Sequence, residues 1–186
     1  MKMIHCVAML QTFVVATAAA RAAEGNPFDA EVLDVRPRVF LRDEPFPGLT
    51  IEKLRSRIDE PEYAGVSEKW RARPMGRALR WMLEGRSEDF DAAVTGLRRM
   101  DAAGGTWSDR GLALVRLVAL FDWLYEDLDE ATRRETIQKI EQAADAATRH
   151  IRGGHAPFYY SRTPSALAGL CVAGLTLNGV SDKAEG

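Results

Sequence analysis

Apolar side chains recur every third or fourth residue through most of the chain after residue 49, the spacing that places them on one face of an α-helix. No stretch alternates apolar and polar residues regularly enough to predict a strand. We therefore predict an all-α domain over residues 49–186. Its helices are expected over residues 51–60, 62–83 (bent or interrupted at Pro74), 88–102, 109–125, 130–152 and 164–177, with N-terminal caps at Thr50, Ser87, Ser108, Asp129 and Thr163.

The predicted helices are of two kinds. Those over residues 109–125 and 164–177 are apolar nearly all round, as expected of helices that are buried on most sides. Those over residues 88–102 and 130–152 carry one apolar stripe and charges elsewhere. Short loops join them, which favours antiparallel helical hairpins with an inner apolar layer and an outer amphipathic layer. A tetratricopeptide array is not favoured, because no motif recurs with a period of about 34 residues.

The first residues of the chain do not fit this helical pattern. A short basic start is followed by an apolar run that ends near Ala20-Arg21-Ala22, a sequence typical of a signal-peptidase site. The run is shorter than the roughly 20 apolar residues that a transmembrane helix needs. We therefore expect residues 1–23 to be a cleaved secretory signal, the mature protein to be periplasmic or secreted, and no membrane span to remain. Residues 24–48 are rich in proline and predict an extended leading segment.

Charge and cysteine content narrow the possible partners. The 186 residues carry a net charge of −2, and loss of Lys2 and Arg21 with the signal would leave 23 basic against 27 acidic residues, or −4. This balance provides no basic stripe for a phosphate backbone, so nucleic acid is not an expected partner. Cys171 would be the only thiol left, which excludes an internal disulfide, and its apolar neighbours along the chain predict that it is buried.

Two loops of the predicted domain concentrate aromatic and charged side chains. Alternate loops of antiparallel helices lie at the same end, so residues 103–108 and 152–163 should share one rim. The side chains of interest there are Trp107, Asp109, Arg110, His155, Phe158, Tyr159, Tyr160, Ser161 and Arg162. Aromatic rings stack on sugar rings and guanidinium groups match carboxylate or sulfate, so this rim suits an acidic polysaccharide. The alternative is that these side chains only pack the loops and complement the helix ends.

Other common functional motifs are absent from the sequence. It contains no HExxH, paired-cysteine, P-loop or GxGxxG pattern, so neither a metal nor a cofactor is expected. The acidic run over residues 126–130 is interpreted as a helix cap with a solvated face rather than as a calcium site.

Two further motifs resemble those of a known family. Arg36-Pro37-Arg38-Val39-Phe40-Leu41 opens the domain, and Phe121-Asp122-Trp123-Leu124-Tyr125 lies within a predicted inner helix. With them, the chain over about residues 36–179 resembles the N-terminal helical domain of heparinase II/III-like and alginate-lyase-like polysaccharide lyases. This resemblance implies an incomplete α/α toroid followed by β-sandwich sheets, and cleavage of a uronic-acid polysaccharide by β-elimination.

The resemblance also implies roles for individual residues. In such lyases an Asn/His pair at the start of an inner helix neutralises the substrate carboxylate, a base removes the C5 proton, and a tyrosine protonates the departing oxygen. The matching place is the loop before Thr163, where His155 has no preceding Asn and Arg162 could replace the amide. The candidate catalytic residues are therefore His155, Tyr159 and Tyr160, and the candidate substrate-binding residues are Trp107, Arg110 and Arg162. In the family, the tyrosine that acts as general acid follows the Asn/His pair by several dozen residues. We therefore expect this sequence to be the front part of a longer lyase and to be inactive alone.

Two other functions remain open from the sequence. An α/α-barrel glycoside hydrolase needs paired carboxylates on its loops, but Asp109 is the only acid on the proposed rim. A non-catalytic helical carbohydrate-binding or scaffold domain needs no catalytic group. Binding of an acidic oligosaccharide without formation of an unsaturated product would favour this last function.

Overall fold

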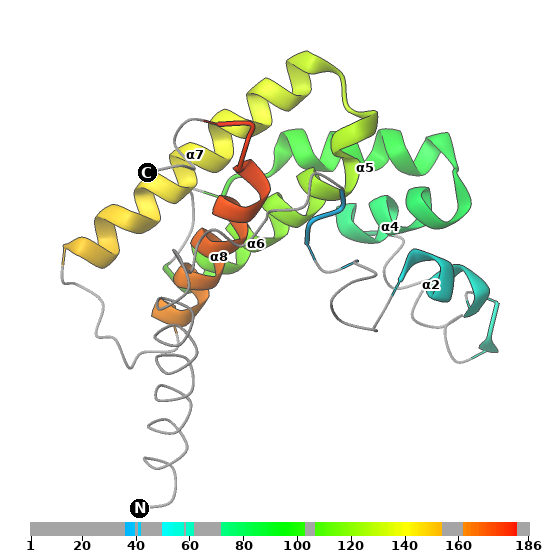
Figure 1. Cartoon of the computed structure of the whole chain (residues 1–186), viewed down its shortest axis with the longest axis horizontal. Coiled ribbons are helices and arrows are strands. Elements are labelled where there is room, and N and C mark those ends of the chain that lie inside the picture. The colour runs from blue at the N-terminus through cyan, green and yellow to red at the C-terminus, as the bar shows by residue number, and fades with distance from the viewer. Residues whose placement is uncertain are drawn as a thin grey trace, which may run out of the picture. The chain divides into compact units, whose positions relative to one another are not determined.

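A computed structural model describes residues 36–39, 41, 50–57, 59–61, 72–102, 107–153 and 162–181, with the backbone alone for residues 107–109 and 162. The elements are α2 (Ile51–Arg57), α4 (Pro74–Glu84), α5 (Ser87–Arg99), α6 (Trp107–Leu124), the 3₁₀-helix η1 (Tyr125–Asp127), α7 (Glu130–Arg152) and α8 (Arg162–Leu177) (Figure 1). Most of the described residues are helical and none of them forms a strand, so the all-α prediction is confirmed. The chain divides into two compact units, Met1–Leu33 and Asp34–Gly186, and all of these elements belong to the second.

Helices α4 and α5 form an antiparallel hairpin. Pro74 lies in the first turn of α4, where its missing N–H has no partner to lose, so it begins a helix and interrupts the predicted stretch. Residues 62–70 of that stretch lie outside the described part of the chain. α4 ends at Gly85, whose φ of 71° is the left-handed conformation that favours glycine. At the other end of the hairpin, a β-carbon added to Gly96 would come within 2.4 Å of the Pro74 ring.

A buried carboxylate in α5 stabilises this hairpin through contacts with α4. Asp89, in the first turn of α5, is fully buried, and its Oδ1 accepts a hydrogen bond from Arg77 of α4 at 2.6 Å. Its Oδ2 lies 3.4 Å from the guanidinium of Arg80, which is also buried. Because a buried charge is tolerated only when it is paired, these contacts favour one alignment of α4 and α5.

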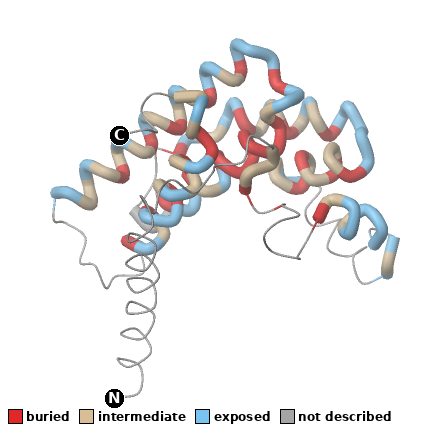
Figure 2. Tube along the Cα trace, viewed as in Figure 1, coloured by how far each residue is buried: buried red, intermediate tan, exposed pale blue. Residues whose placement is uncertain are grey.

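Helix α6 forms the centre of the hydrophobic core (Figure 2). Six of its side chains are at most 1% exposed, namely those of Leu114, Leu117, Val118, Leu120, Phe121 and Leu124. Apolar residues of α4, α5, α7 and α8 pack around them, so the predicted burial of this helix on most sides is confirmed. Leu112, which is 48% exposed, is the exception. Neither α6 nor any other helix of the described residues is long and apolar enough to cross a bilayer.

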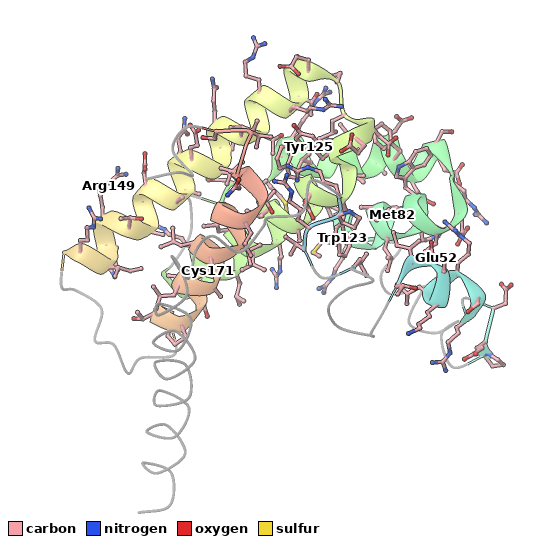
Figure 3. The ribbon with its side chains drawn as sticks, viewed as in Figure 1. Glu52, Met82, Trp123, Tyr125, Arg149 and Cys171 are labelled. Carbon is pink, nitrogen blue, oxygen red and sulfur yellow. The ribbon has the colours of Figure 1, made fainter. Side chains whose placement is uncertain are left out.

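Helix α8 is covered less completely than its sequence predicts. Leu167 is 37% exposed and Leu175 is 50% exposed. Cys171, which lies between them in the sequence and is labelled in Figure 3, is exposed as well, and the spacing of four residues places all three on one stripe of the helix. The prediction of all-round burial is therefore wrong for this helix, as is the prediction that Cys171 is buried. The reason is that α6 and α7, the described helices that pack extensively on α8, cover its other faces.

Helix α7 packs on both α6 and α8 and has the predicted bounds. The carboxylate of Asp129 caps it by accepting a hydrogen bond from the Thr132 N–H at 2.8 Å, as predicted. The buried residues of α7 follow helical spacing and are Thr132, Thr136, Ile140, Ala143 and Ala147. Lys139 of α7 also donates to the carbonyl of Arg98 in α5 at 2.6 Å. The amphipathic helix α7 therefore turns one stripe to the core and its charges outward.

Of two further predicted helix caps, one is confirmed and the other is wrong. Thr50 caps α2 as predicted, since its Oγ1 accepts a hydrogen bond from the N–H of Lys53 at 3.1 Å. Ser87 does not cap α5, because it is the first helical residue and Arg86 occupies the cap position without a side-chain bond. Glu88 and Asp89 in the first turn already complement the positive end of α5, which reduces the need for a capping side chain.

Candidate functional site

Helices α6 and α8 touch through their backbones near the start of each helix. A β-carbon added to Gly111 of α6 would lie 2.6 Å from the carbonyl carbon of Ser165 and 2.7 Å from the nitrogen of Ala166 in α8. One turn farther along α8, a β-carbon added to Gly169 would lie 3.1 Å from the carbonyl oxygen of Gly111. The missing side chains of these two glycines therefore allow the close approach of the helices.

Contacts at the opposite end show that α6 and α8 run parallel. Arg36 donates to Asp122 Oδ1, near the end of α6, at 2.6 Å and to the carbonyl of Thr176, near the end of α8, at 2.9 Å. Residues near the two helix starts thus lie together, and so do residues near the two helix ends. This is the arrangement expected of alternate helices in a series of antiparallel hairpins.

The structure places three of the candidate residues at the common N-terminal end. Trp107 is the first residue of α6, Arg162 is the first residue of α8, and Arg110 lies one turn into α6 with a half-buried side chain. The sequence assigned Trp107 and Arg162 to loops and Ser108 and Thr163 to cap positions, and these boundaries are wrong, because both helices begin earlier. The first N–H groups of a helix have no partner within it, so polar residues and Pro164 fit inside the first turn.

The remaining candidates, His155, Tyr159 and Tyr160, lie within residues 154–161, outside the described part of the chain. Their position relative to the helix starts stays a prediction. Asp109, the one acid of the proposed rim, is the third residue of α6.

The common end of α6 and α8 brings together donor groups of the kind that bind anions, beside the acidic residue Asp109. The first four N–H groups of each helix have no partner within it, and the macrodipole leaves partial positive charge there. Two such ends lie side by side here, with Arg110 in the first turn of α6 and Thr163, which is 4% exposed, in the first turn of α8. A carboxylate or sulfate at this end would meet N–H donors of both helices and a guanidinium group.

The two sequence motifs that contain Arg36 and Asp122 meet at the other end of α6. Besides the ion pair of Arg36 with Asp122, the Val39 N–H donates to Asp122 Oδ2 at 2.8 Å, and the Trp123 indole donates to the Val39 carbonyl at 3.1 Å. The side chains of Arg36 and Asp122 are 4% and 0% exposed. We call Arg36, Val39, Asp122 and Trp123 the motif clasp. Because its polar groups bond to one another, the clasp holds residues 36–39 on α6.

Burial governs ionisation in the motif clasp. Loss of water raises the pKa of the Asp122 carboxyl, and the hydrogen bonds from Val39 and Arg36 offset this only in part. Loss of water also lowers the pKa of Arg36. The Arg36 guanidinium lies 3.8 Å from the centroid of the Tyr125 ring, a cation–π contact that compensates some of its lost hydration. Sequence reasoning found both motifs but not their contact, because 86 residues separate Arg36 from Asp122.

Comparison with known proteins leaves the geometry as the guide to function. No protein family matches this chain, and neither does a curated protein or a solved structure. Among the described residues, no group of His, Cys, Asp and Glu side chains is arranged to hold a metal ion.

Proposed function

We propose that this chain forms part of a secreted polysaccharide lyase that cleaves a uronic-acid polysaccharide, of the heparin, heparan sulfate or alginate type, by β-elimination. In this proposal the helical hairpins belong to an incomplete α/α toroid, and the substrate binds at the common N-terminal end of α6 and α8. The observation that carries it is the parallel contact of the two helices at Gly111 and Ser165, because Trp107, Arg110 and Arg162 then share that end.

The chemistry of β-elimination suits an anion site at two helix starts. The C5 proton of a uronate is weakly acidic, and negative charge builds on the adjacent carboxylate as the proton leaves. The helix N–H groups and the guanidinium groups of Arg110 and Arg162 would neutralise that charge. His155 is proposed to act with Arg162 in this neutralisation. A base then removes the proton and an acid protonates the departing glycosidic oxygen, and Tyr159 or Tyr160 is the candidate acid within this chain.

A non-catalytic domain that binds an acidic oligosaccharide is the second candidate. It would use the same positive helix ends but would need no acid or base. Export to the periplasm or beyond, directed by a signal over residues 1–23, belongs to both proposals. Formation of an unsaturated product separates the two functions.

Binding is tested on the chain with oligosaccharides of heparan sulfate, alginate and hyaluronan by isothermal titration calorimetry. We expect binding that weakens with added salt, and an affinity lower by about tenfold or more in Arg110→Ala and Arg162→Ala, because each loses a charged hydrogen-bond donor. Arg86→Ala is the matched control, since it removes the same charge from an exposed site at the turn between α4 and α5. An equal loss in Arg86→Ala, or no binding at all, would contradict the proposed location.

Turnover is tested in a longer protein that carries this chain, by the ultraviolet absorbance of the unsaturated uronide. His155→Ala and Arg162→Ala should lower kcat while far-UV circular dichroism stays unchanged. Binding with no unsaturated product from any of the polysaccharides would support the non-catalytic alternative instead.

A further inference from the structure

A cavity lies at the end of α6 that is opposite the proposed polysaccharide site. It has a volume of about 330 Å³, and its walls include Trp81 and Met82 of α4, Trp123 of α6, and Glu126 and Asp127 of η1. Met82 and Trp123 are labelled in Figure 3. This volume falls within the range of about 300–1,000 Å³ that is usual for small-molecule sites. At about 1.5 Å per helical residue, the cavity lies roughly 18 Å along α6 from Gly111, so it is a separate site.

The charge on the wall of this cavity is negative. Arg36 and Asp122 also border it, but they neutralise each other in their ion pair. Glu126 and Asp127 are both exposed, and neither carboxylate forms an ion pair within the described residues. Two uncompensated carboxylates therefore remain at the mouth of the cavity.

The position of these carboxylates is unfavourable for the helix that precedes them. Glu126 and Asp127 directly follow α6, at the end where the helix macrodipole is negative, and acidic side chains there lower stability. Arg133 donates to the carbonyls of Tyr125 and Glu126 at 2.9 and 3.0 Å and so compensates the backbone at this helix end. Within the described part of the chain, the Glu126 carboxylate has no ion-pair partner. A cation bound in the cavity would compensate the two carboxylates.

Two indole rings give the cavity its apolar body. The Trp81 indole N–H donates to Asp127 Oδ2 at 2.9 Å, and Phe90 supports the same ring with a centroid separation of 5.2 Å. The Trp123 N–H is bound to the Val39 carbonyl. Because both N–H groups already have acceptors, the rings offer a ligand apolar surface, which suits an alkyl stem.

We propose that this cavity binds an organic cation that carries a primary ammonium or guanidinium group on a short apolar stem. The charged group lies at Glu126 and Asp127, and the stem lies against Trp81 and Trp123. A free amine and the side chain of a lysine or arginine in another protein share this chemistry. The inference does not depend on the proposed polysaccharide function.

The experiment titrates the whole chain with n-butylamine and n-butylguanidine, followed by tryptophan fluorescence and calorimetry. n-Butanol is the uncharged probe of the same stem, and N-acetyl-lysine methylamide represents a lysine side chain. We expect both cations to bind saturably and more weakly in high salt, and n-butanol to bind far more weakly. The double variant Glu126→Gln/Asp127→Asn should lose about fivefold or more in affinity for the cations, since it removes two charge partners and both sites are exposed enough to leave the fold unchanged.

Asp91→Asn is the matched control, because Asp91 is an exposed acid of α5 that does not line the cavity. Its affinity for n-butylamine should equal that of the parent chain. Binding of n-butylamine without binding of N-acetyl-lysine methylamide supports a free amine as the ligand, and binding of both supports a protein side chain as well. The proposal is overturned if neither cation binds saturably, if n-butanol binds as tightly, or if the double variant keeps the full affinity.

Discussion

Replacing Gly111 with alanine should destabilise this protein, although alanine is the better helix former. The new methyl group would lie 2.6 Å from the carbonyl carbon and 2.7 Å from the carbonyl oxygen of Ser165, and 2.7 Å from the nitrogen of Ala166. All three are backbone atoms of α8, so no side-chain rotation can make room. Helices α6 and α8 must separate instead, at the end where the proposed substrate binds.

The size of the effect follows from these distances. Non-bonded heavy atoms pack best at about 3.5–4.0 Å, so the helices must move apart by about 1 Å. Overpacking costs about 1–3 kcal/mol, and an obstacle made of backbone places Gly111→Ala in the upper part of that range. The helix propensity of alanine returns about 1 kcal/mol. We therefore expect the free energy of unfolding to fall by about 1–2 kcal/mol.

Two glycines of α8 serve as graded controls in urea denaturation followed by far-UV circular dichroism. At Gly169 an added β-carbon would lie 3.1 Å from the Gly111 carbonyl oxygen and 3.2 Å from Leu114 Cδ2, so the loss should be smaller. At Gly174 it would meet nothing within 4 Å, and alanine should raise the free energy of unfolding by about 0.5–1 kcal/mol. If Gly111→Ala is as stable as Gly174→Ala, the inferred contact between the two backbones is wrong.

Two further predictions concern charged groups. Asp122→Ala should lower the free energy of unfolding by about 3–5 kcal/mol in urea denaturation, because it leaves the Arg36 charge buried without its partner. Arg57→Ala breaks an exposed ion pair and should change the free energy of unfolding by less than about 1 kcal/mol. Similar effects in both variants would contradict a stabilising role for the buried ion pair. Hydrogen bonding from Thr132 lowers the pKa of Asp129 below its ordinary 3.8, so its contribution to stability is complete above that value and is lost as the pH falls through the lowered pKa. Asp129→Asn keeps a capping oxygen but cannot titrate, so stability measured from neutral to acidic pH should fall less steeply than in the parent chain, and an identical pH profile would count against the capping carboxylate.

The sequence alone determined most helix positions, because the signals that place a helix act within a few residues. Helix α7 begins after Asp129 and ends at Arg152, as its apolar period and its cap predict. Helix α4 ends at Gly85, where a left-handed residue is needed. Among the boundaries that differ, those at the starts of α6 and α8 fall where polar residues and proline fit equally well before or inside a first turn.

The candidate site could be predicted only in outline. Alternation of helix direction was enough to bring the starts of α6 and α8 to one end, and with them Trp107, Arg110 and Arg162. The glycine contact that fixes the distance between those helices gives no local signal, since Gly111 and Gly174 look alike in the sequence and only Gly111 meets another backbone. The cavity beside Trp123 likewise combines residues of separate helices.

Tertiary structure decided which surfaces meet. Asp122 appears in the sequence as one acid within an apolar helix, and only the fold pairs it with Arg36, 86 residues away. Helix α8 is apolar on every side, yet Leu167 and Leu175 are exposed, because α6 and α7 cover only part of its circumference. An apolar face can pack against any neighbour of suitable shape, so local periodicity specifies that a helix forms but leaves its partners to the packing of the whole chain.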